Sequence, residues 1–230
     1  MKPECIISTL AGRLIVSCQA YPGEPLSNPQ IMRRMAEAAV LGGAAGIRAQ
    51  GLEDVQLIHE TVTVPQIGLW KVGSDGVFIT PTLRHALAVA AAGAEIVAID
   101  GTRRPRPDGL TLEQTITELH KRTAALIMAD VDDLENGIAS EAAGADLVST
   151  TLAGYTESRP RTAGPDLALV SDLAGRVRIP VLAEGRVRTT GQALACLEAG
   201  AHAVVVGTAI THPTSITRWF ADALSQRVQS

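Results

Sequence analysis

VLAEGRVRTTGQALACLEAGAHAVVVGTAIT, residues 181–211, is the stretch that decides the fold. Two short apolar runs, at 181–183 and 203–206, are each followed by a glycine-bearing turn, Glu184-Gly185-Arg186 and Gly207-Thr208. The order is strand, turn, helix, strand, turn, helix. Glycine lets backbone N–H groups approach an anion, and the next helix N-terminus adds partial positive charge. Such paired turns suit a phosphate group, and as the last two turns of an eight-unit barrel they form its usual phosphate site.

An internal repeat extends this pattern along the whole chain. Ala- and Gly-rich segments precede apolar runs at four places, Gly43, Gly93, Gly144 and Gly200. These glycines lie 50, 51 and 56 residues apart, and glycine is the preferred residue just past a helix C-terminus. A repeat of this length is twice a compact strand-plus-helix unit, so four double units make eight. We therefore predict an α/β fold, a (β/α)8 TIM barrel forming one domain over residues 1–230, with a short helix within 1–12 closing the barrel floor.

The expected elements place polar residues at the strand ends. Helices are expected at 29–41, 52–59, 82–92, 112–122, 134–143, 166–173, 191–199 and 216–227, with Asn28, Thr80, Thr111 and Thr190 as candidate N-caps. Strands are expected to end near Gln19, Arg48, Lys71, Asp100, Asp130, Thr150, Glu184 and Gly207. Because the loops at the carboxyl ends of barrel strands form the pocket, this layer of polar residues indicates a functional site.

Composition excludes several classes of function. With 46% hydrophobic residues and a net charge of −4, the chain can bury a large core and lacks the basic surface of a nucleic-acid-binding protein. No segment reaches the roughly 18 consecutive apolar residues of a membrane helix, and the N-terminus lacks a secretory signal core. The three cysteines are widely spaced, as in a reduced compartment. We expect a cytoplasmic protein that contacts neither membrane nor nucleic acid.

The residue types at the strand ends narrow the chemistry. Most histidines fall on predicted helices or their ends, so we expect no metal site there. Neither a GxGxxG turn nor a GxxxxGKS loop is present, and we expect no cofactor. An amine, carboxylates and an arginine around a phosphate site suit proton transfer next to a carbonyl, or Schiff-base chemistry, on a phosphorylated metabolite.

Several motifs together carry a family resemblance. They are SCQA at 17–20, GIRAQG at 46–51, the strand leading to Lys71, AID at 98–100 with RRPRP at 103–107, MAD at 128–130, STTLAGYT at 149–156 and AEGR at 183–186. From about residue 17 to 220, the chain resembles the bacterial N-acetylmannosamine-6-phosphate 2-epimerases. The resemblance implies a (β/α)8 barrel and a homodimer. It also implies an isomerase of sialic acid degradation that interconverts N-acetylmannosamine 6-phosphate and N-acetylglucosamine 6-phosphate without a metal or nucleotide.

The resemblance also assigns the proton-transfer pair. In the family, the residues that correspond to Lys71 and Glu184 are the proton-transfer pair, so the resemblance implies catalytic roles for these two residues. Inverting C2 requires opening of the sugar ring, removal of the C2 proton and stabilisation of an enolate oxygen. Which of the two residues takes the C2 proton is left open by the sequence. To act as a base near neutral pH, Lys71 needs a pKa lowered by burial or by a cation such as Arg48.

Further residues are expected to bind the substrate. We expect Arg48 to polarise a substrate oxygen, Gln19 to hold the acetamido group or a hydroxyl, and Asp130 to orient the lysine or a sugar hydroxyl. The phosphate is expected to meet the backbone N–H groups of four residues, Gly185, Arg186, Gly207 and Thr208, with the Arg186 side chain as a further contact. His212 stands where the family carries an arginine after the last strand, so we expect weaker or more pH-dependent phosphate binding.

Two other functions remain open from the sequence. One is another barrel enzyme that forms a Schiff base at Lys71, and the other is a non-catalytic sugar-phosphate sensor, against which the intact pair of Lys71 and Glu184 argues. Asp100 is expected to support the site indirectly or to pair with Arg103. The long polar segment 151–165 indicates a loop over the pocket mouth, and the sequence leaves open whether this loop acts as a lid.

Overall fold

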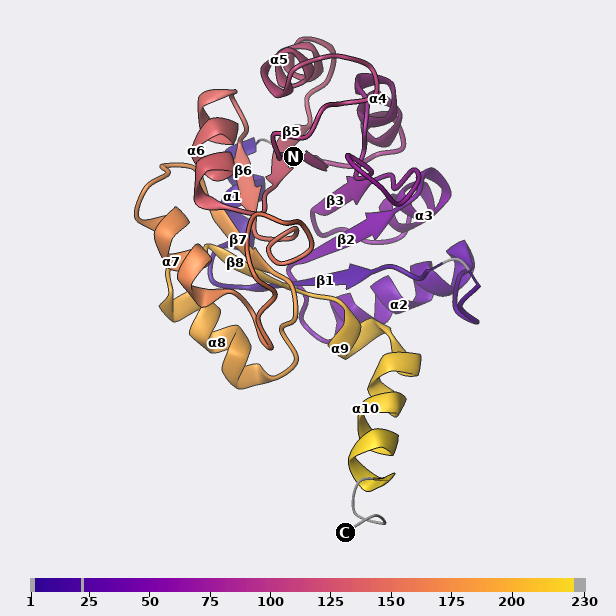
Figure 1. Cartoon of the computed structure of the whole chain (residues 1–230). Coiled ribbons are helices and arrows are strands. Elements are labelled where there is room, and N and C mark those ends of the chain that lie inside the picture. The colour runs from indigo at the N-terminus through magenta and orange to yellow at the C-terminus, as the bar shows by residue number, and fades with distance from the viewer. Residues whose placement is uncertain (1–2, 22, 226–230) are drawn as a thin grey trace.

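Eight parallel strands close into a barrel in the order β1 to β8, with β1 paired to β8. The computed structural model describes residues 3–21 and 23–225. The strands are β1 Leu14–Cys18, β2 Gly46–Gln50, β3 Gln66–Leu69, β4 Ile96–Asp100, β5 Leu126–Asp130, β6 Leu147–Ser149, β7 Val181–Glu184 and β8 Ala203–Val206. The helices are α1 Pro3–Leu10, α2 Pro29–Leu41, α3 Leu52–His59, α4 Leu83–Ala91, α5 Leu112–Arg122, α6 Leu134–Ala142, α7 Leu167–Ala174, α8 Thr190–Glu198, α9 Thr208–Thr211 and α10 Pro213–Ser225. The predicted (β/α)8 TIM barrel is confirmed (Figure 1).

Alternation along each strand fills both sides of the barrel wall. In β1, Ile15 packs with the apolar side chains that fill the barrel interior, whereas its neighbour Val16 packs against the helix layer. Both faces of the strands are therefore buried, which explains their continuous apolar composition. In β3, a Cβ on Gly68 would lie 2.6 Å from Cβ of Ala94, so glycine is required for the close packing of the wall.

The helix predictions agree with the structure because their signals are local. The helices expected at 29–41, 52–59 and 112–122 have the predicted bounds, and the others differ by one to three residues. Asn28 accepts hydrogen bonds from the first turn of α2, and Thr111 forms a capping box with Gln114. The other two predicted caps are wrong by one or two residues, because Thr82 caps α4 and Thr189 caps α8. Of the expected helix 216–227, residues 226 and 227 lie outside the described residues.

The repeat glycines have the conformation that the helix-end argument requires. Their φ angles are +97°, +106°, +95° and +100° at Gly43, Gly93, Gly144 and Gly200. This is the left-handed region, which glycine enters without steric cost. The repeat therefore records four equivalent helix ends that lead into β2, β4, β6 and β8.

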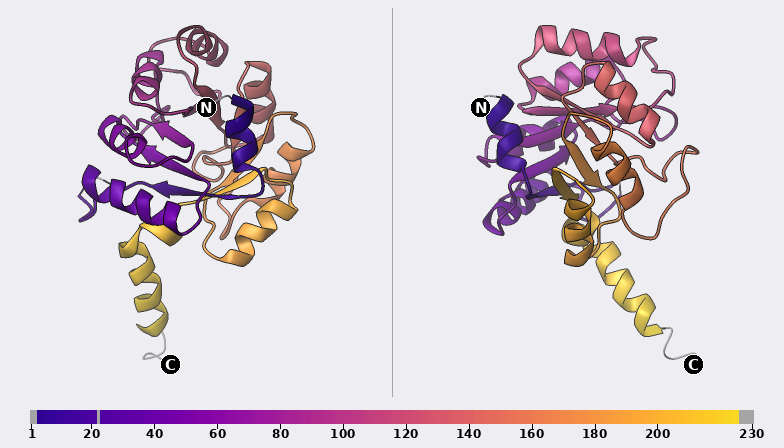
Figure 2. Two further views of the ribbon diagram at one scale, coloured as in Figure 1. Left: turned by 180° about the vertical axis from the view of Figure 1, so that it is seen from behind. Right: turned by 90° about the vertical axis from the view of Figure 1, so that its left-hand side faces the viewer.

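Helix α1 lies across the amino-terminal end of the barrel (Figure 2). Its Ile6 and Leu10 are buried among the side chains that fill the barrel interior. Just after the helix, the N–H of Gly12 donates to the carbonyl of His202 before β8, at 2.7 Å. Of the segment 1–12 expected to close the floor, residues 1 and 2 lie outside the described residues.

Three features near the carboxyl ends of the strands differ from expectation. Strand β2 continues past Arg48 to Gln50, and Lys71 lies two residues beyond β3. The short helix α9 follows β8 directly and was not predicted. Helix α10 projects away from the barrel and has no buried residue (Figures 1 and 2). None of the helices within the described ranges is long and apolar enough to cross a membrane.

Candidate active site

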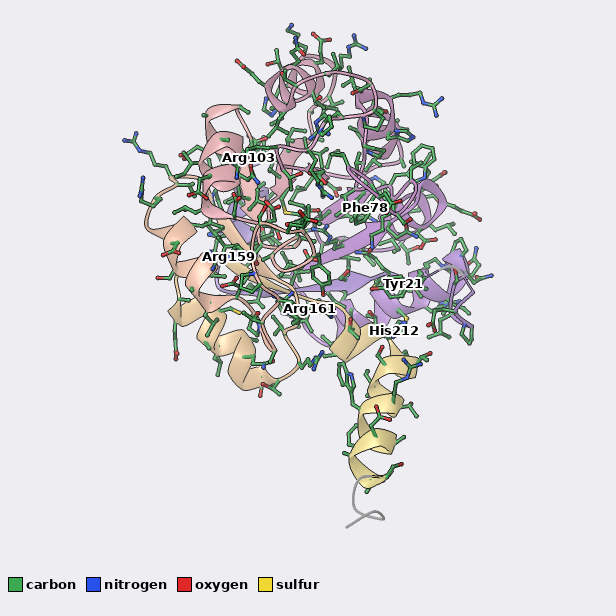
Figure 3. The ribbon with its side chains drawn as sticks, in the orientation of Figure 1. Tyr21, Phe78, Arg103, Arg159, Arg161 and His212 are labelled. Atoms are coloured by element: carbon green, nitrogen blue, oxygen red, sulfur yellow. The ribbon has the colours of Figure 1, made fainter. Side chains whose placement is uncertain are left out.

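A cavity of about 930 Å³ opens at the carboxyl ends of the strands. Nine of the predicted site residues line it, namely Gln19, Arg48, Lys71, Glu184, Gly185, Arg186, Gly207, Thr208 and His212. In Figure 3 the labelled Tyr21, Phe78, Arg161 and His212 lie around its mouth, in front of the strands. The tenth residue, Asp130, is fully buried behind the cavity wall.

The guanidinium of Arg48 is the centre of the charge arrangement. Arg48 is only 1% exposed and reaches across the barrel from β2. Its Nη1 and Nη2 donate to both carboxylate oxygens of Asp130, at 3.0 and 2.6 Å, in the bidentate geometry typical of strong arginine–carboxylate pairs. Nη1 also lies 2.8 Å from Oε2 of Glu184. One cation therefore holds two carboxylates that come from β5 and β7.

Thr151 joins the same arrangement from the loop after β6. Its hydroxyl lies 2.7 Å from Oδ1 of Asp130 and 3.1 Å from Oε2 of Glu184. One hydroxyl proton can serve only one of these carboxylates at a time. Thr151 was not predicted, although it lies in the STTLAGYT motif; its position between two carboxylates depends on contacts between distant strands.

Lys71 reaches the cavity from the segment after β3. Its Nζ donates to Oε1 of Gln19 at 2.8 Å, and Gln19 in turn donates to the hydroxyl of Ser17 at 2.8 Å. Burial and the nearby positive charge of Arg48 lower the pKa of Lys71, more than Glu184 and Asp130 raise it. The expectation that Arg48 tunes this lysine therefore agrees with the electrostatics of the site.

Burial acts in opposite directions on the pKa values of Glu184 and Arg48. Burial raises the pKa of Glu184, and the opposing attraction of Arg48 does not cancel that rise. Burial disfavours the charge on Arg48, but Asp130 and Glu184 outweigh it and raise the pKa of Arg48 above its ordinary value. The site therefore combines a fixed cation, an amine whose pKa is lowered and a carboxyl group whose pKa is raised.

Two glycine turns meet at the other side of the cavity. Gly185 has a φ of +113°, which L side chains rarely adopt, and follows Glu184 directly. Gly207 precedes α9, and a Cβ there would lie 3.2 Å from Cβ of Ser17, so a side chain would crowd β1. Residues of both turns line the cavity, and the binding of a phosphate by their backbone stays a prediction.

The side chain of Arg186 fastens the loop that follows β6. Its guanidinium donates to the carbonyls of Ala153 and Gly164, at 2.8 and 3.0 Å, and to the hydroxyl of Thr162 at 2.9 Å. It also lies 5.3 Å from the centre of the Tyr155 ring. The contacts of this side chain are thus with the segment 151–165, and its contact with a phosphate stays a prediction.

His212 occupies the rim of the cavity between two partners. Its Nδ1 lies 2.7 Å from the hydroxyl of Ser215, and its Nε2 lies 3.4 Å from Oε1 of Glu24. The edge of its ring faces Tyr21, with 5.5 Å between the ring centres. Because His212 lies beside the carboxylate of Glu24, an anion that approaches the histidine would also come near this carboxylate.

The remaining strand-end residues support the site from outside the cavity wall. Asp130 bonds Arg48 and Thr151 rather than Lys71, so orientation of the lysine by Asp130 is not seen. Thr150 holds the backbone of Glu184, because its hydroxyl donates to the carbonyl of Glu184 at 2.9 Å and accepts from its N–H at 3.0 Å.

Asp100 is fully buried and pairs with a different arginine from the one expected. The expected partner Arg103 lies on the side of α6 (Figure 3) and bonds Asp133 instead. Arg104 donates to Asp100 at 2.6 Å. Thr102 donates to Asp100 through both its N–H and its hydroxyl. Asp100 thus organises the loop after β4.

Within residues 3–21 and 23–225, no group of three or more histidine, cysteine and acidic side chains is placed to hold a metal ion. The groups that meet in the cavity are instead an amine, a guanidinium, a carboxyl group and hydroxyls. These groups can move protons and stabilise a developing oxyanion. The fold and the site are those of a (β/α)8 barrel whose cavity brings an amine, a guanidinium and a carboxyl group together with a pair of glycine turns.

Comparison with known proteins assigns the chain to a family. Residues 32–226 match the family described as "Putative N-acetylmannosamine-6-phosphate epimerase". The chain belongs to this family. Relatives named "Putative N-acetylmannosamine-6-phosphate 2-epimerase" include one from Cutibacterium acnes, 55% identical over 95% of this chain and 96% of its own length. Another, from Caldanaerobacter subterraneus, is 49% identical over 96% of this chain and 95% of its own length.

Solved structures give the same assignment. The N-acetylmannosamine-6-phosphate 2-epimerase from Clostridium perfringens superposes with a TM-score of 0.91 at 42% identity, over 94% of this chain and 95% of that one. A thiamine phosphate pyrophosphorylase from Pyrococcus furiosus superposes with a TM-score of 0.62 at 19% identity, over 89% of each chain, and shares the fold alone. The family resemblance expected from the motifs is confirmed.

Proposed function

We propose that this protein interconverts N-acetylmannosamine 6-phosphate and N-acetylglucosamine 6-phosphate by proton transfer at C2. The observation that carries the proposal is the meeting of Lys71, whose pKa is lowered, with the ion pair of buried Arg48 and half-buried Glu184 in one cavity. Relatives covering nearly the whole chain are named for this activity, which favours it over a Schiff-base enzyme or a sensor. Because such sugar phosphates are metabolites of the cell interior, we place the protein in the cytoplasm.

Ring opening comes first in this mechanism. The pyranose ring masks C1, so the C2 proton becomes acidic only when C1 is a free aldehyde. Glu184 is suited to move a proton between the ring oxygen and the anomeric oxygen, because a raised pKa favours the protonated form that gives a proton, and the resulting carboxylate can take one back. The hydrogen bonds of Glu184 to Arg48 and Thr151 hold it in place for this step.

Removal of the C2 proton follows, and we assign it to Lys71. An amine with a lowered pKa is unprotonated in a larger fraction of molecules, which is the state a base requires. Gln19 accepts one N–H of this amine and so fixes its direction. Arg48, fully charged and buried, is placed to stabilise the enolate oxygen, since a charge in a dry site acts strongly. Glu184, as the second acid in the cavity, then gives a proton to the opposite face of C2, which completes the inversion. Lys71 passes the abstracted proton to solvent, and Glu184 takes one up.

The phosphate binds at the glycine turns in this proposal. The N–H groups of Gly185, Arg186, Gly207 and Thr208 supply the donors, as at other paired turns next to helix N-termini. The binding of a non-reacting phosphate gives energy that orients C2 at Lys71. His212 and Glu24 at the rim adjust the local charge.

The activity is tested by incubating purified protein with N-acetylmannosamine 6-phosphate and following the anomeric signals by proton NMR. The proposal predicts growth of the signals of N-acetylglucosamine 6-phosphate to a constant ratio. Lys71→Ala abolishes the conversion while still binding the substrate, measured by calorimetry. Binding by the wild-type protein without any conversion would favour the sensor over the epimerase.

We also propose that the protein is a homodimer. Helix α10 carries Phe220 and Leu224 one turn apart, and these side chains are 69% and 66% exposed. No residue of this helix is buried, and the helix projects from the barrel (Figure 2). An amphipathic helix gains stability by covering its apolar face, and a second copy of this chain offers the same helix in return. Light scattering of the wild type and of Phe220→Glu tests this: a dimer that becomes a monomer in the variant is expected, and a monomeric wild type contradicts the proposal.

A further inference from the structure

Thr80 has a backbone conformation that its residue type disfavours. It is fully buried, with a φ of +48°. Within the described ranges, Arg186 is the other non-glycine residue with a positive φ. A β-branched residue in the left-handed region is strained, whereas glycine adopts it freely. The side chain of Thr80 must therefore supply something that glycine cannot.

What the side chain supplies is a contact to Trp70. The N–H of Trp70 donates to Oγ1 of Thr80 at 3.1 Å, and the N–H of Thr80 donates to the carbonyl of Trp70 at 2.9 Å. Both backbone groups of Trp70 are thus held by one residue. Without the hydroxyl, the N–H of Trp70 would lose its hydrogen-bond partner next to a fully buried residue, which costs free energy.

This contact is the base of a ribbon that carries Lys71. Lys71 pairs with Ile79 as an antiparallel bridge, and the N–H of Val72 donates to the carbonyl of Phe78 at 3.0 Å. The carbonyl of Ile79 in turn accepts from the N–H of Asp100, at the end of β4, at 3.1 Å. Where β3 no longer pairs with β4, the segment around Ile79 therefore pairs with the end of β4 instead and extends the barrel wall.

The direction of the Lys71 side chain follows from its neighbour. The Trp70 ring faces His85 of α4 edge-on, with 4.7 Å between ring centres, so Trp70 points to the helix layer. Successive side chains of an extended chain point to opposite sides, so Lys71 points into the barrel mouth, where it meets Gln19. A rotation of the backbone at Trp70 would move the amine away from the cavity.

We propose that Thr80 is the positioning residue for Lys71: its strained backbone and its hydroxyl together fix Trp70, and thereby hold the Lys71 amine in the cavity. The inference rests on the proposed role of Lys71 as the base. It adds a residue that touches no substrate and acts through the backbone of its neighbour.

Three variants at Thr80 separate this role from a contribution to stability. Thr80→Ser keeps the hydroxyl, Thr80→Ala removes it, and Thr80→Gly removes both the hydroxyl and the strain. The matched control is Thr115→Ala, because Thr115 is equally buried but its hydroxyl bonds the carbonyl of Thr111 within α5, away from the cavity.

We expect kcat of Thr80→Ala and Thr80→Gly to fall about ten- to hundredfold with KM changed less than about threefold, since a displacement of about 1 Å costs this much in rate. Thr80→Gly keeps a Tm near that of the wild type, because relief of strain offsets the lost contact. In both variants the acid limb of the pH profile of kcat/KM moves to higher pH, because a less buried Lys71 has a more ordinary pKa. Thr80→Ser and Thr115→Ala stay within about threefold of wild-type kcat, as expected of changes that leave Trp70 held.

Modification of Lys71 by an acylating reagent, measured by peptide mass spectrometry across pH, gives a readout that needs no turnover. Labelling of Lys71 in Thr80→Gly is expected to need a higher pH than in the wild type, because an amine with a more ordinary pKa stays protonated up to higher pH. Wild-type kcat, pH profile and labelling in Thr80→Gly would overturn the inference, and so would a loss in Thr80→Ser as large as in Thr80→Ala. If the wild-type protein does not epimerise the substrate, the proposed function fails, and the labelling still decides whether Thr80 positions the lysine.

Discussion

Replacing Arg48 with methionine removes the cation at the centre of the site while keeping an unbranched side chain. The guanidinium lies 2.6 and 3.0 Å from the oxygens of Asp130 and 2.8 Å from Glu184, and it is buried. The variant leaves two carboxylates facing each other in a site that the cation no longer neutralises. Removal of one partner of a buried ion pair costs about 3–5 kcal/mol. For a chain of this size, each kcal/mol lowers Tm by about 2–4 °C, so we expect a loss of roughly 6–20 °C.

The size of this loss depends on pH, with a definite sign. Burial raises the pKa of Glu184 above its unfolded value, and Arg48 opposes that rise. Without Arg48 the pKa of Glu184 rises further, and a group with a raised pKa in the folded state favours folding only while it is protonated. Stability is therefore lost as pH rises through that pKa. The difference between wild type and variant is expected to be largest near about pH 8 and smaller near about pH 5.

Urea unfolding followed by far-ultraviolet circular dichroism at the two pH values measures this difference. The double variant Arg48→Met/Asp130→Asn is the control for charge, because it removes one of the two stranded carboxylates and should regain part of the lost stability. A loss below about 1 kcal/mol at the higher pH, the size of a surface ion pair, would refute the reasoning. So would equal losses at both pH values.

Three further outcomes follow from the same contacts. The acid limb of the pH profile of kcat/KM reports the pKa of Lys71. Arg48→Met is expected to move this limb to higher pH, because a neighbouring positive charge no longer lowers the pKa of the amine. A limb that does not move would show that another group sets it. Gly185→Ala forces a side chain into a φ of +113°, which costs about 1–3 kcal/mol in the turn proposed to bind the phosphate. Steady-state kinetics should therefore show a raised KM with a smaller change in kcat. An unchanged KM would count against the phosphate assignment. His212→Arg places a permanent positive charge at the rim beside Glu24. Calorimetry with N-acetylglucosamine 6-phosphate should show tighter binding than in the wild type, whereas weaker binding would place the phosphate elsewhere.

The sequence predicted the parts of the fold that local interactions determine. Asn28 and Thr111 cap helices through bonds to the next few residues, and the glycines at 43 and 93 end helices through their own φ angles. The pattern of apolar runs then gave the barrel, because parallel strands buried on both faces need helices between them. The meeting of Arg48 with Glu184 followed from that topology, since both lie near carboxyl ends of strands.

Features that depend on contacts between distant segments were not predictable in this way. Thr80 reads as a helix cap before a proline, but its partner is Trp70 across a ribbon, and Thr82 caps the helix. The helix at 208–211 is too short to show a periodicity. Asp130 carries no local sign that its partner is Arg48 rather than Lys71. The sequence of α10 likewise does not show that this helix projects from the barrel, because an amphipathic pattern predicts only that one face of a helix is covered.

The central claim is that Lys71 removes the proton from C2, and isotope exchange tests it most directly. The protein is incubated with N-acetylmannosamine 6-phosphate in heavy water, and deuterium at C2 is followed by NMR in both epimers. The account predicts deuterium at C2 together with the gluco epimer for the wild type, and neither for Lys71→Ala, which still binds the substrate. Exchange at C2 in Lys71→Ala at the wild-type rate would contradict the account and assign the proton transfer to another group.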